Sequence, residues 1–312
     1  MRFIGLNKQI RRNNIRSFLL LCAFPGLILV GVYAFFYFTI GVSNLEQANK
    51  DFLYAIPFVL AGVLIWFLIA YFANSTMIRL STGAHSLDRK DNMRIYNLLE
   101  NLCISKGMKM PKLFVIETNA LNAFASGIDE KSYAVTLTRG IIDTLDDEEL
   151  EGVMAHELAH IRNKDVRLLI ISIIFVGIFS FIVSVLFRSL LYGAGNRNNK
   201  KTDGKLIIVA LLIAAVVYGL SLLFKFALSR KREYLADAGA VEMTKNAGAL
   251  ASALRKISGQ SEVENIKSDD MKQMFIENKP KAGFFSFIGG LFATHPPIEK
   301  RIAILERGIS IE

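Results

Sequence analysis

The sequence predicts an α+β, mainly α, membrane protein with four transmembrane helices in two hairpins and a small cytoplasmic domain that holds a short β-sheet. Three observations support this fold class: long stretches without charge, short apolar segments typical of strands, and an HExxH pattern on a well-defined helix. The expected domains are a transmembrane hairpin, a core with the sheet and the HExxH helix, a second hairpin and a C-terminal part: 1–80, 81–166, 167–228 and 229–312.

Four stretches of the chain contain no charged residue: 17–45, 52–78, 168–187 and 206–224. Each is close to or longer than the ~20 residues that a helix needs to cross a hydrocarbon layer ~30 Å thick. A chain of 312 residues has too little soluble structure to bury so much apolar surface, and the first stretch is too long for a cleaved signal peptide. We therefore expect four transmembrane helices.

The distribution of basic residues predicts which side of the membrane the soluble parts face. Basic residues precede the first apolar stretch and follow the second, whereas the short loop between them carries only Lys50; they are Arg2, Lys8, Arg11, Arg12 and Arg16, then Arg79, Arg89, Lys90 and Arg94. Because cytoplasmic segments carry the excess of Lys and Arg, we expect a multi-pass protein of the cytoplasmic membrane with its active site in the cytoplasm.

The loop between the third and fourth stretches disagrees with this orientation, because it also holds basic residues: Arg197, Lys200, Lys201 and Lys205. Two explanations stay open. The first hairpin dominates the orientation, or the second hairpin enters the membrane without fully crossing it.

The soluble segment between the second and third stretches has the pattern of a small α/β core. Residues 91–107 have helical periodicity, and 112–118, 123–125 and 132–138 are short apolar segments separated by turn residues. We expect a helix followed by three strands. An edge strand can bind an extended peptide by strand addition, but the pattern alone favours an ordinary hairpin.

The segment 147–163 is the best-defined helix of the sequence. Acidic residues at 146–149 suit the positive end of the helix dipole, and apolar residues then recur at helical spacing. On this helix His156 and His160 lie one turn apart on one face, where both imidazoles can bind one zinc ion while Glu157 reaches a water on the metal. The alternative is a chance pattern with two ordinary polar histidines.

A hydrolytic zinc keeps three protein ligands, so a third ligand is needed outside this helix. Cys22 lies in an apolar stretch and Cys103 on an unrelated helix, which argues against a thiolate. Glu233 and Asp237 share one face of a predicted helix, so that one carboxylate can bind zinc and the other can hold a ligand imidazole. The alternative is a solvated charged face beside the basic residues 230–232.

Near the C-terminus, Thr294 before two prolines is typical of a helix start. This start places His295 at the beginning of the helix and Arg301 further along it. The alternative is that His295 caps the helix and Arg301 extends over the surface. The apolar segment 283–293 is too short to span a membrane, and packed core is preferred over a flap that covers a cleft.

Four motifs in this order make the chain similar to the HtpX-type membrane zinc proteases, which are relatives of the CAAX prenyl proteases: LNAFASG at 121–127, HELAHIRNKD at 156–165, EYLAD at 233–237 and THPPIEKR at 294–301. The resemblance covers nearly the whole chain and implies a zincin-like cytoplasmic domain. It also implies the roles of individual residues: His156, His160 and Glu233 as ligands of one Zn²⁺ per chain, Glu157 as catalytic base, Asp237 as support of a ligand histidine, His295 and Arg301 at the reacting carbonyl, and Asn122, Ala123 and Phe124 at the substrate.

The expected function is therefore a membrane-bound zinc endopeptidase, and the resemblance implies damaged or misassembled membrane proteins as substrates. One alternative is a prenyl-peptide protease, although those relatives have more spans. Another is a non-catalytic zinc-binding scaffold or sensor, in which Glu157 would serve no purpose. The expected partners are protein or peptide substrates and membrane lipids.

The net charge of +9 does not indicate a protein that binds nucleic acid. The basic residues gather at the ends of the apolar stretches, where they meet anionic lipid head groups, and no basic stripe with stacking aromatic residues is evident. Two cysteines without paired spacing predict no disulfide framework and agree with a reducing cytoplasm.

Overall fold

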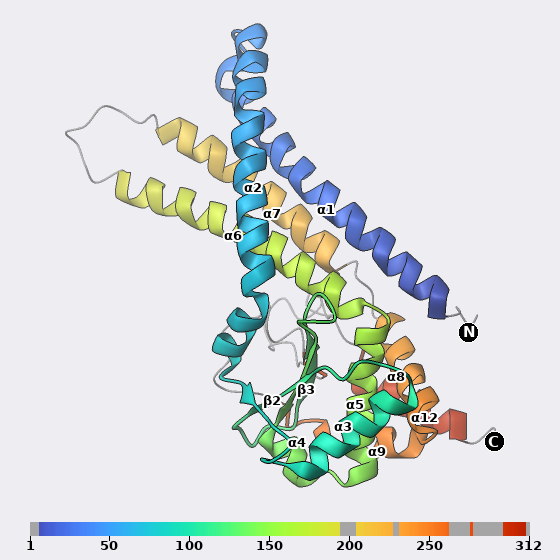
Figure 1. Cartoon of the computed structure of the whole chain (residues 1–312). Coiled ribbons are helices and arrows are strands. Elements are labelled where there is room, and N and C mark those ends of the chain that lie inside the picture. The colour runs from blue at the N-terminus through green and yellow to red at the C-terminus, as the bar shows by residue number, and fades with distance from the viewer. Residues whose placement is uncertain (1–5, 194–203, 227–230, 262–274, 277–295, 310–312) are drawn as a thin grey trace. The chain divides into compact units, whose positions relative to one another are not determined.

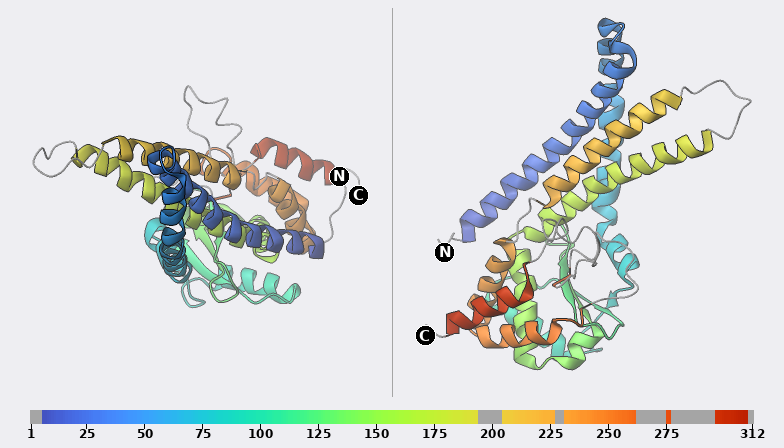
Figure 2. Two further views of the ribbon diagram at one scale, coloured as in Figure 1. Left: turned by 90° about the horizontal axis from the view of Figure 1, so that it is seen from above. Right: turned by 180° about the vertical axis from the view of Figure 1, so that it is seen from behind.

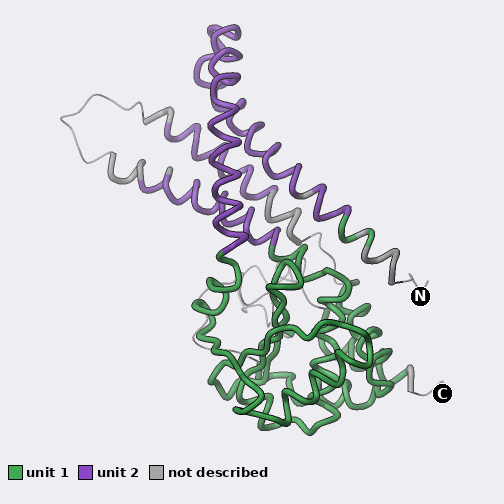
Figure 3. The backbone as a smooth tube through the Cα atoms, viewed as in Figure 1, with its two compact units in different colours: residues 1–14, 73–170, 228–312 green, residues 15–72, 171–227 purple. Residues whose placement is uncertain are grey.

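The computed structural model of the chain describes residues 6–193, 204–226, 231–261, 275–276 and 296–309 (Figure 1). It contains two compact units, which we treat separately (Figure 3). Unit 1 comprises residues 1–14, 73–170 and 228–312, and unit 2 comprises residues 15–72 and 171–227.

Unit 2 consists of long apolar helices. They are α1 (Leu6–Phe36), which continues into the π-helical turn η1 (Tyr37–Gly41), α2 (Leu45–Thr82), α6 (Asp165–Gly193) and α7 (Gly204–Phe226). The N-terminal parts of α1 and α6 and the C-terminal part of α2 belong to unit 1. Within unit 2, Phe24 of α1 stacks on Phe175 of α6 with ring centroids 4.6 Å apart, and Phe67 of α2 lies 5.8 Å from the same Phe175 ring. These aromatic contacts join three helices.

Three of the described helices are long and apolar enough to cross a membrane, over Asn13–Gly41, Leu45–Thr82 and Asp165–Val185. Helix α7 adds a shorter apolar segment, Ile207–Leu220. Phe58 and Phe72 of α2 are 79% and 78% exposed, which suits lipid and not water. The expectation of several apolar membrane helices is thus supported, whereas the count of four and their arrangement as two hairpins remain predictions.

Unit 1 contains a mixed sheet of four strands, β1 (His85–Ser86), β2 (Lys112–Ile116), β3 (Ala123–Ser126) and β4 (Ala134–Thr138), in the order β1-β2-β4-β3. Strands β2 and β4 are parallel, and the other two pairs are antiparallel. The three strands expected from the sequence are present, and β1, with only two residues, was too short to leave a pattern. Strand β3 lies at an edge and, among the described strands, pairs only with β4.

Unit 1 contains α5 (Asp147–Arg162) together with several other helices (Figures 1 and 2). They are α3 (Met93–Ser105), α4 (Arg139–Thr144), α8 (Lys231–Thr244), α9 (Ala247–Ile257) and α12 (Ile298–Ile309). Helix α5 packs against α8 and α9 as well as against β3. Its residues from Gly152 to Ala159 are all buried, so a polar side chain in that segment is held in one place by its neighbours.

Candidate metal centre and active site

The two histidines lie on α5, whose N-terminus is closed by a capping box. The Asp146 side chain accepts a hydrogen bond from the Glu149 N–H at 2.9 Å, and the Glu149 side chain accepts one from the Asp146 N–H at 3.1 Å. One turn apart, His156 and His160 project from the same face, and their Nε2 atoms are 3.2 Å apart. The side chains are 1% and 13% exposed.

Helix α8 brings Glu233 to the same point. Its side facing α5 carries small residues: Ala236 and Ala240 are fully buried, and a Cβ added to Gly239 would lie only 2.9 Å from the Ala159 Cβ of α5. These small side chains let the two backbones approach closely. Glu233, which precedes Gly239 on the same helix, therefore reaches the histidines.

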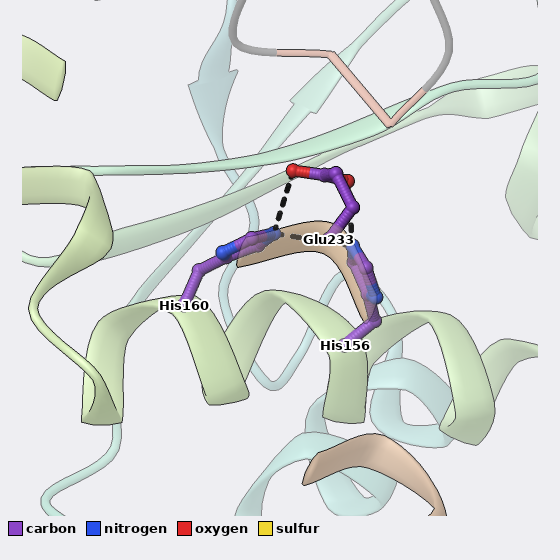
Figure 4. A group of neighbouring side chains, drawn as sticks. All are labelled: His156, His160 and Glu233. Carbon is purple, nitrogen blue, oxygen red and sulfur yellow. Dashed lines mark hydrogen bonds and ion pairs between the residues drawn. The ribbon is translucent and has the colours of Figure 1, made fainter. Parts of the chain in front are cut away.

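The three side chains have separations suited to a metal ion (Figure 4). Glu233 Oε2 lies 3.6 Å from His156 Nε2, and Glu233 Oε1 lies 3.6 Å from His160 Nε2. Four ligands at about 2.1 Å from zinc form a tetrahedron with edges of about 3.4 Å, close to these separations. Two imidazoles and one carboxylate are also a ligand set typical of catalytic zinc, with a fourth position for water. The residues present therefore fit one Zn²⁺.

A buried charge network lies behind His156. Asp237 Oδ1 is 2.9 Å from His156 Nδ1, and the guanidinium of Arg301 donates to both Asp237 oxygens at 2.7 and 2.9 Å. Burial opposes ionisation of Asp237, but Arg301 and His156 outweigh it and lower the pKa of Asp237 to about 2. Burial and Arg301 lower the pKa of His156, but Asp237 and Glu233 outweigh them and raise it to about 9. An ionised Asp237 thus holds Nδ1, which leaves Nε2 for the metal.

His160 has a corresponding support that our sequence analysis missed. Asp165 Oδ2 lies 3.3 Å from His160 Nδ1, and Asp165 Oδ1 accepts a hydrogen bond from Asn13 at 2.7 Å. Asn13 also donates to the Asn163 carbonyl at 2.8 Å, so α1 braces the turn after α5. The only signal in the sequence was that Asp165 is an acidic residue five positions after His160. A turn separates the two residues, and in it Lys164 adopts a φ of 60°.

Glu157 links α5 to the sheet. Its side chain is 2% exposed, and its carboxylate accepts a hydrogen bond from the Ala125 N–H of β3. Burial raises the pKa of Glu157 above its ordinary value, and the neighbouring histidines offset part of that effect. A carboxylate with a raised pKa is a better proton acceptor, as a general base requires.

The structure brings the predicted ligands, the predicted base and Asp237 into one cluster with Arg301. Arg301 was expected at the reacting carbonyl, but its guanidinium lies against Asp237 and close to the His156 ring, at 3.4 Å. The three residues expected at the substrate lie at the edge strand: Ala123 and Phe124 within β3, and Asn122 just before it. His295 and the segment 283–293 lie outside the described residues.

A buried helix with an HExxH motif, a glutamate from a second helix within reach of both histidines and a neighbouring edge strand are typical of zinc metallopeptidases. The chain belongs to peptidase family M48, whose model matches residues 89–309.

Curated relatives extend this match to nearly the whole length. A protein of Bacteroides fragilis called "Protease HtpX homolog" is 53% identical over 321 aligned positions, which cover 98% of this chain and all of the relative. A protein of Tropheryma whipplei with the same name is 35% identical over 95% of this chain and 96% of its own length. The solved structure of S. mikatae Ste24p is a more distant likeness, with 19% identity, a TM-score of 0.49, and coverage of 95% of this chain and 66% of the other.

Proposed function

We propose that this chain is an HtpX-type, membrane-bound zinc endopeptidase that cuts damaged or misfolded membrane proteins from the cytoplasmic side. The observation that carries the proposal is the meeting of His156, His160 and Glu233 next to Glu157, in which His156, Glu157 and Glu233 are buried and His160 is partly buried. A non-catalytic zinc site would need neither Glu157 nor an open coordination position.

The residues of the chain divide the work of peptide hydrolysis. When bound by His156, His160 and Glu233, zinc supplies a Lewis acid that polarises a carbonyl and lowers the pKa of a water toward about 7. Glu157 takes the proton from the attacking water as the C–O bond forms. It then delivers that proton to the amine as the C–N bond breaks, which leaves Glu157 ionised for the next cycle.

Edge strand β3 provides the place for the substrate backbone. An extended peptide can add to the side of β3 that faces away from β4, and the small side chain of Ala123 allows close approach. His295 and Arg301 are proposed to stabilise the negative charge on the carbonyl oxygen. Arg301 has a further role through Asp237, because it keeps that carboxylate ionised and His156 in place.

The apolar helices support the membrane part of the proposal. The described helices α1, α2 and α6 contain segments long enough to span, and basic residues at their ends suit anionic head groups. A protease anchored in this way has access to membrane proteins that fail to assemble.

Substitution of the base tests the assignment. Glu157→Gln keeps the shape and the neighbouring ligands but cannot accept a proton, so we expect unchanged zinc content and a loss of cleavage of about 100-fold or more. The measurement is zinc stoichiometry together with digestion of an unfolded protein such as reduced casein by the full chain in detergent. Cleavage by the variant at the parental rate would disprove the role of Glu157.

A further inference from the structure

The open edge of β3 faces the candidate base. In the antiparallel pairing of β3 with β4, alternate residues of β3 turn their backbone groups away from β4. Ala125 directs its N–H to Glu157, and the Ala123 carbonyl points to the same outer side. Any peptide strand that pairs with this edge therefore lies beside the catalytic carboxylate.

Two residues of the chain itself already pair with this edge. The Ile276 N–H donates to the Ala123 carbonyl at 2.9 Å and to the Asn122 Oδ1 at 3.1 Å, and the Ile276 carbonyl accepts from Arg301 at 3.2 Å. The Phe275 ring meets the Phe124 ring edge-on with centroids 5.0 Å apart. Phe275 and Ile276, here called the edge pair, are 3% and 2% exposed.

Other backbone contacts reinforce this arrangement. The Leu121 N–H donates to the Gln260 carbonyl at 2.7 Å, and the Asn122 amide donates to the Ser261 carbonyl at 2.8 Å. Residues 260 and 261, which follow α9, thus contact the residues just before β3, and the edge pair contacts β3 itself at Ala123. A substrate strand and the edge pair would need the same acceptors, so they cannot bind there together.

We propose that the edge pair is an internal, substrate-like ligand that occupies the backbone-binding edge of β3 until a substrate strand displaces it. This inference rests on the proposed function of the site. It also assigns a preference: the subsite next to Phe124 takes an aromatic or large apolar side chain, and the residue after it must carry an N–H for Ala123 and Asn122. Only molecules in which the edge of β3 is free can bind substrate, so the apparent affinity for substrate falls as the fraction of free molecules falls.

The guanidinium of Arg301 contacts both the edge pair and a residue of the candidate metal site. The same guanidinium that holds Asp237, and through it His156, also donates to the Ile276 carbonyl. When a substrate displaces the edge pair, Arg301 loses its hydrogen bond to the Ile276 carbonyl. A substrate carbonyl in the same place accepts a hydrogen bond from Arg301 instead, so the number of hydrogen bonds made by Arg301 does not change.

Matched substitutions at one position test the proposal. Ile276→Pro removes the N–H, whereas Ile276→Ala removes the same side chain and keeps the N–H. Both are made in the full chain together with Glu157→Gln, so that no cleavage interferes. The probe is a fluorescein-labelled peptide with the sequence of residues 272–279, KQMFIENK, and the readout is fluorescence anisotropy in detergent with zinc present.

We expect the Ile276→Pro variant to bind the peptide at least about tenfold more tightly than the Ile276→Ala variant, and a control peptide KQMFPENK, which lacks the N–H, to bind neither. Equal affinity of the two variants for KQMFIENK would overturn the proposal. Because binding is measured without turnover, tighter binding by the proline variant supports the edge pair as ligand even if zinc-dependent cleavage is never observed.

Hydrogen exchange gives a test that needs no variant. In the chain that carries only Glu157→Gln, we expect the amides of residues 275 and 276 to exchange slowly, and to exchange faster when the KQMFIENK peptide saturates the protein. Slow exchange that the saturating peptide leaves unchanged would overturn displacement as the mechanism.

Discussion

Each histidine of the candidate metal site is held by a carboxylate on the nitrogen that faces away from the proposed metal position. Asp237 contacts His156 Nδ1 at 2.9 Å, and Asp165 contacts His160 Nδ1 at 3.3 Å. A carboxylate at Nδ1 selects the tautomer whose Nε2 carries the free lone pair, and it fixes the plane of the ring. The two supports come from different helices, α8 and α6, which explains why the HExxH pattern alone does not reveal them.

Substitution of Asp165 measures the value of such a support. Asp165→Asn keeps the size of the side chain but removes its charge, so it accepts the His160 N–H more weakly. We expect zinc affinity to fall about 10- to 100-fold, as is typical when a partner of a ligand histidine is changed. Competition with a fluorescent zinc chelator gives the affinity. The exposed Asp143 is the control, and Asp143→Asn should match the parent; equal affinities of all three proteins would contradict the role of Asp165.

At this scale the sequence was enough to propose His156, His160, Glu157, Glu233 and Asp237 as site residues, because helical spacing places each of them near another candidate ligand, base or supporting residue. Asp165 could not be found in this way, since a turn separates it from His160. The location of Arg301 was also beyond the sequence: nothing in the residues around it shows that its guanidinium meets Asp237 from another helix.

At the scale of elements, the site depends on how closely α5 and α8 approach. Gly239 lies where a Cβ would be 2.9 Å from the Ala159 Cβ, closer than real Cβ atoms come. Glu233 is carried by the same helix, so any outward movement of α8 moves a proposed metal ligand.

We therefore expect Gly239→Ala to push α8 away from α5 and to lower both zinc affinity and proteolysis, although alanine favours the helix itself by about 1 kcal/mol. The measurement is zinc affinity and casein cleavage in detergent. Gly177→Ala in α6, where an added Cβ has no neighbour within 4 Å, is the matched control and should behave like the parent. Parental zinc affinity in Gly239→Ala would show that the helix spacing does not limit the site.

Glu149 connects α5 to α9 and makes stability depend on pH. Its carboxylate accepts hydrogen bonds at 2.6 Å from Ser252 and at 2.6 Å from Lys256. Burial acts to raise the pKa of Glu149, but the bonds with Lys256 and Ser252 outweigh it and lower the pKa below its ordinary value of 4.5. Because the folded-state pKa is lowered, the contribution to stability is fully present above pH 4.5 and is lost as the pH falls through the folded-state value.

We therefore expect the melting temperature of the parent to fall more steeply than that of Glu149→Gln as the pH is lowered below 4.5. Circular dichroism of both proteins in the same detergent provides the comparison. The exposed Glu130 gives a control, Glu130→Gln, which should follow the parental curve. Parallel curves for the parent and Glu149→Gln would show that the ionised carboxylate adds nothing.

At the scale of the whole molecule, the chain passes through unit 2 between the two helices that carry the candidate metal ligands. His160 and Glu233 both lie in unit 1, while residues 171–227 between them belong to unit 2. The two ligand helices thus meet only if the intervening apolar segment returns to the side from which it started. This requirement holds whether that segment crosses the membrane twice or enters without crossing.

Accessibility of the basic loop distinguishes these two topologies. In a chain without Cys22 and Cys103, a single cysteine is introduced by Asn198→Cys or by Ser86→Cys. If both hairpins cross, a membrane-impermeant maleimide added to intact spheroplasts should label Asn198→Cys and leave Ser86→Cys unlabelled, because the basic residues around the first hairpin keep residue 86 in the cytoplasm. Labelling of Asn198→Cys only after lysis would indicate a second hairpin that does not cross.

The sequence by itself determined the membrane helices, the metal-binding pattern and the short strands, because all of these depend on periodicity or on the length of apolar stretches, which are local properties. The tertiary structure decided which side chains meet across a turn or between distant segments: Asp165 at His160, Arg301 at Asp237, Ile276 at the edge of β3, and the parallel pairing of β2 with β4 that places β3 at the edge. Such contacts arise when packing brings together segments up to 154 residues apart, as for Asn122 and Ile276, and no local pattern records that geometry.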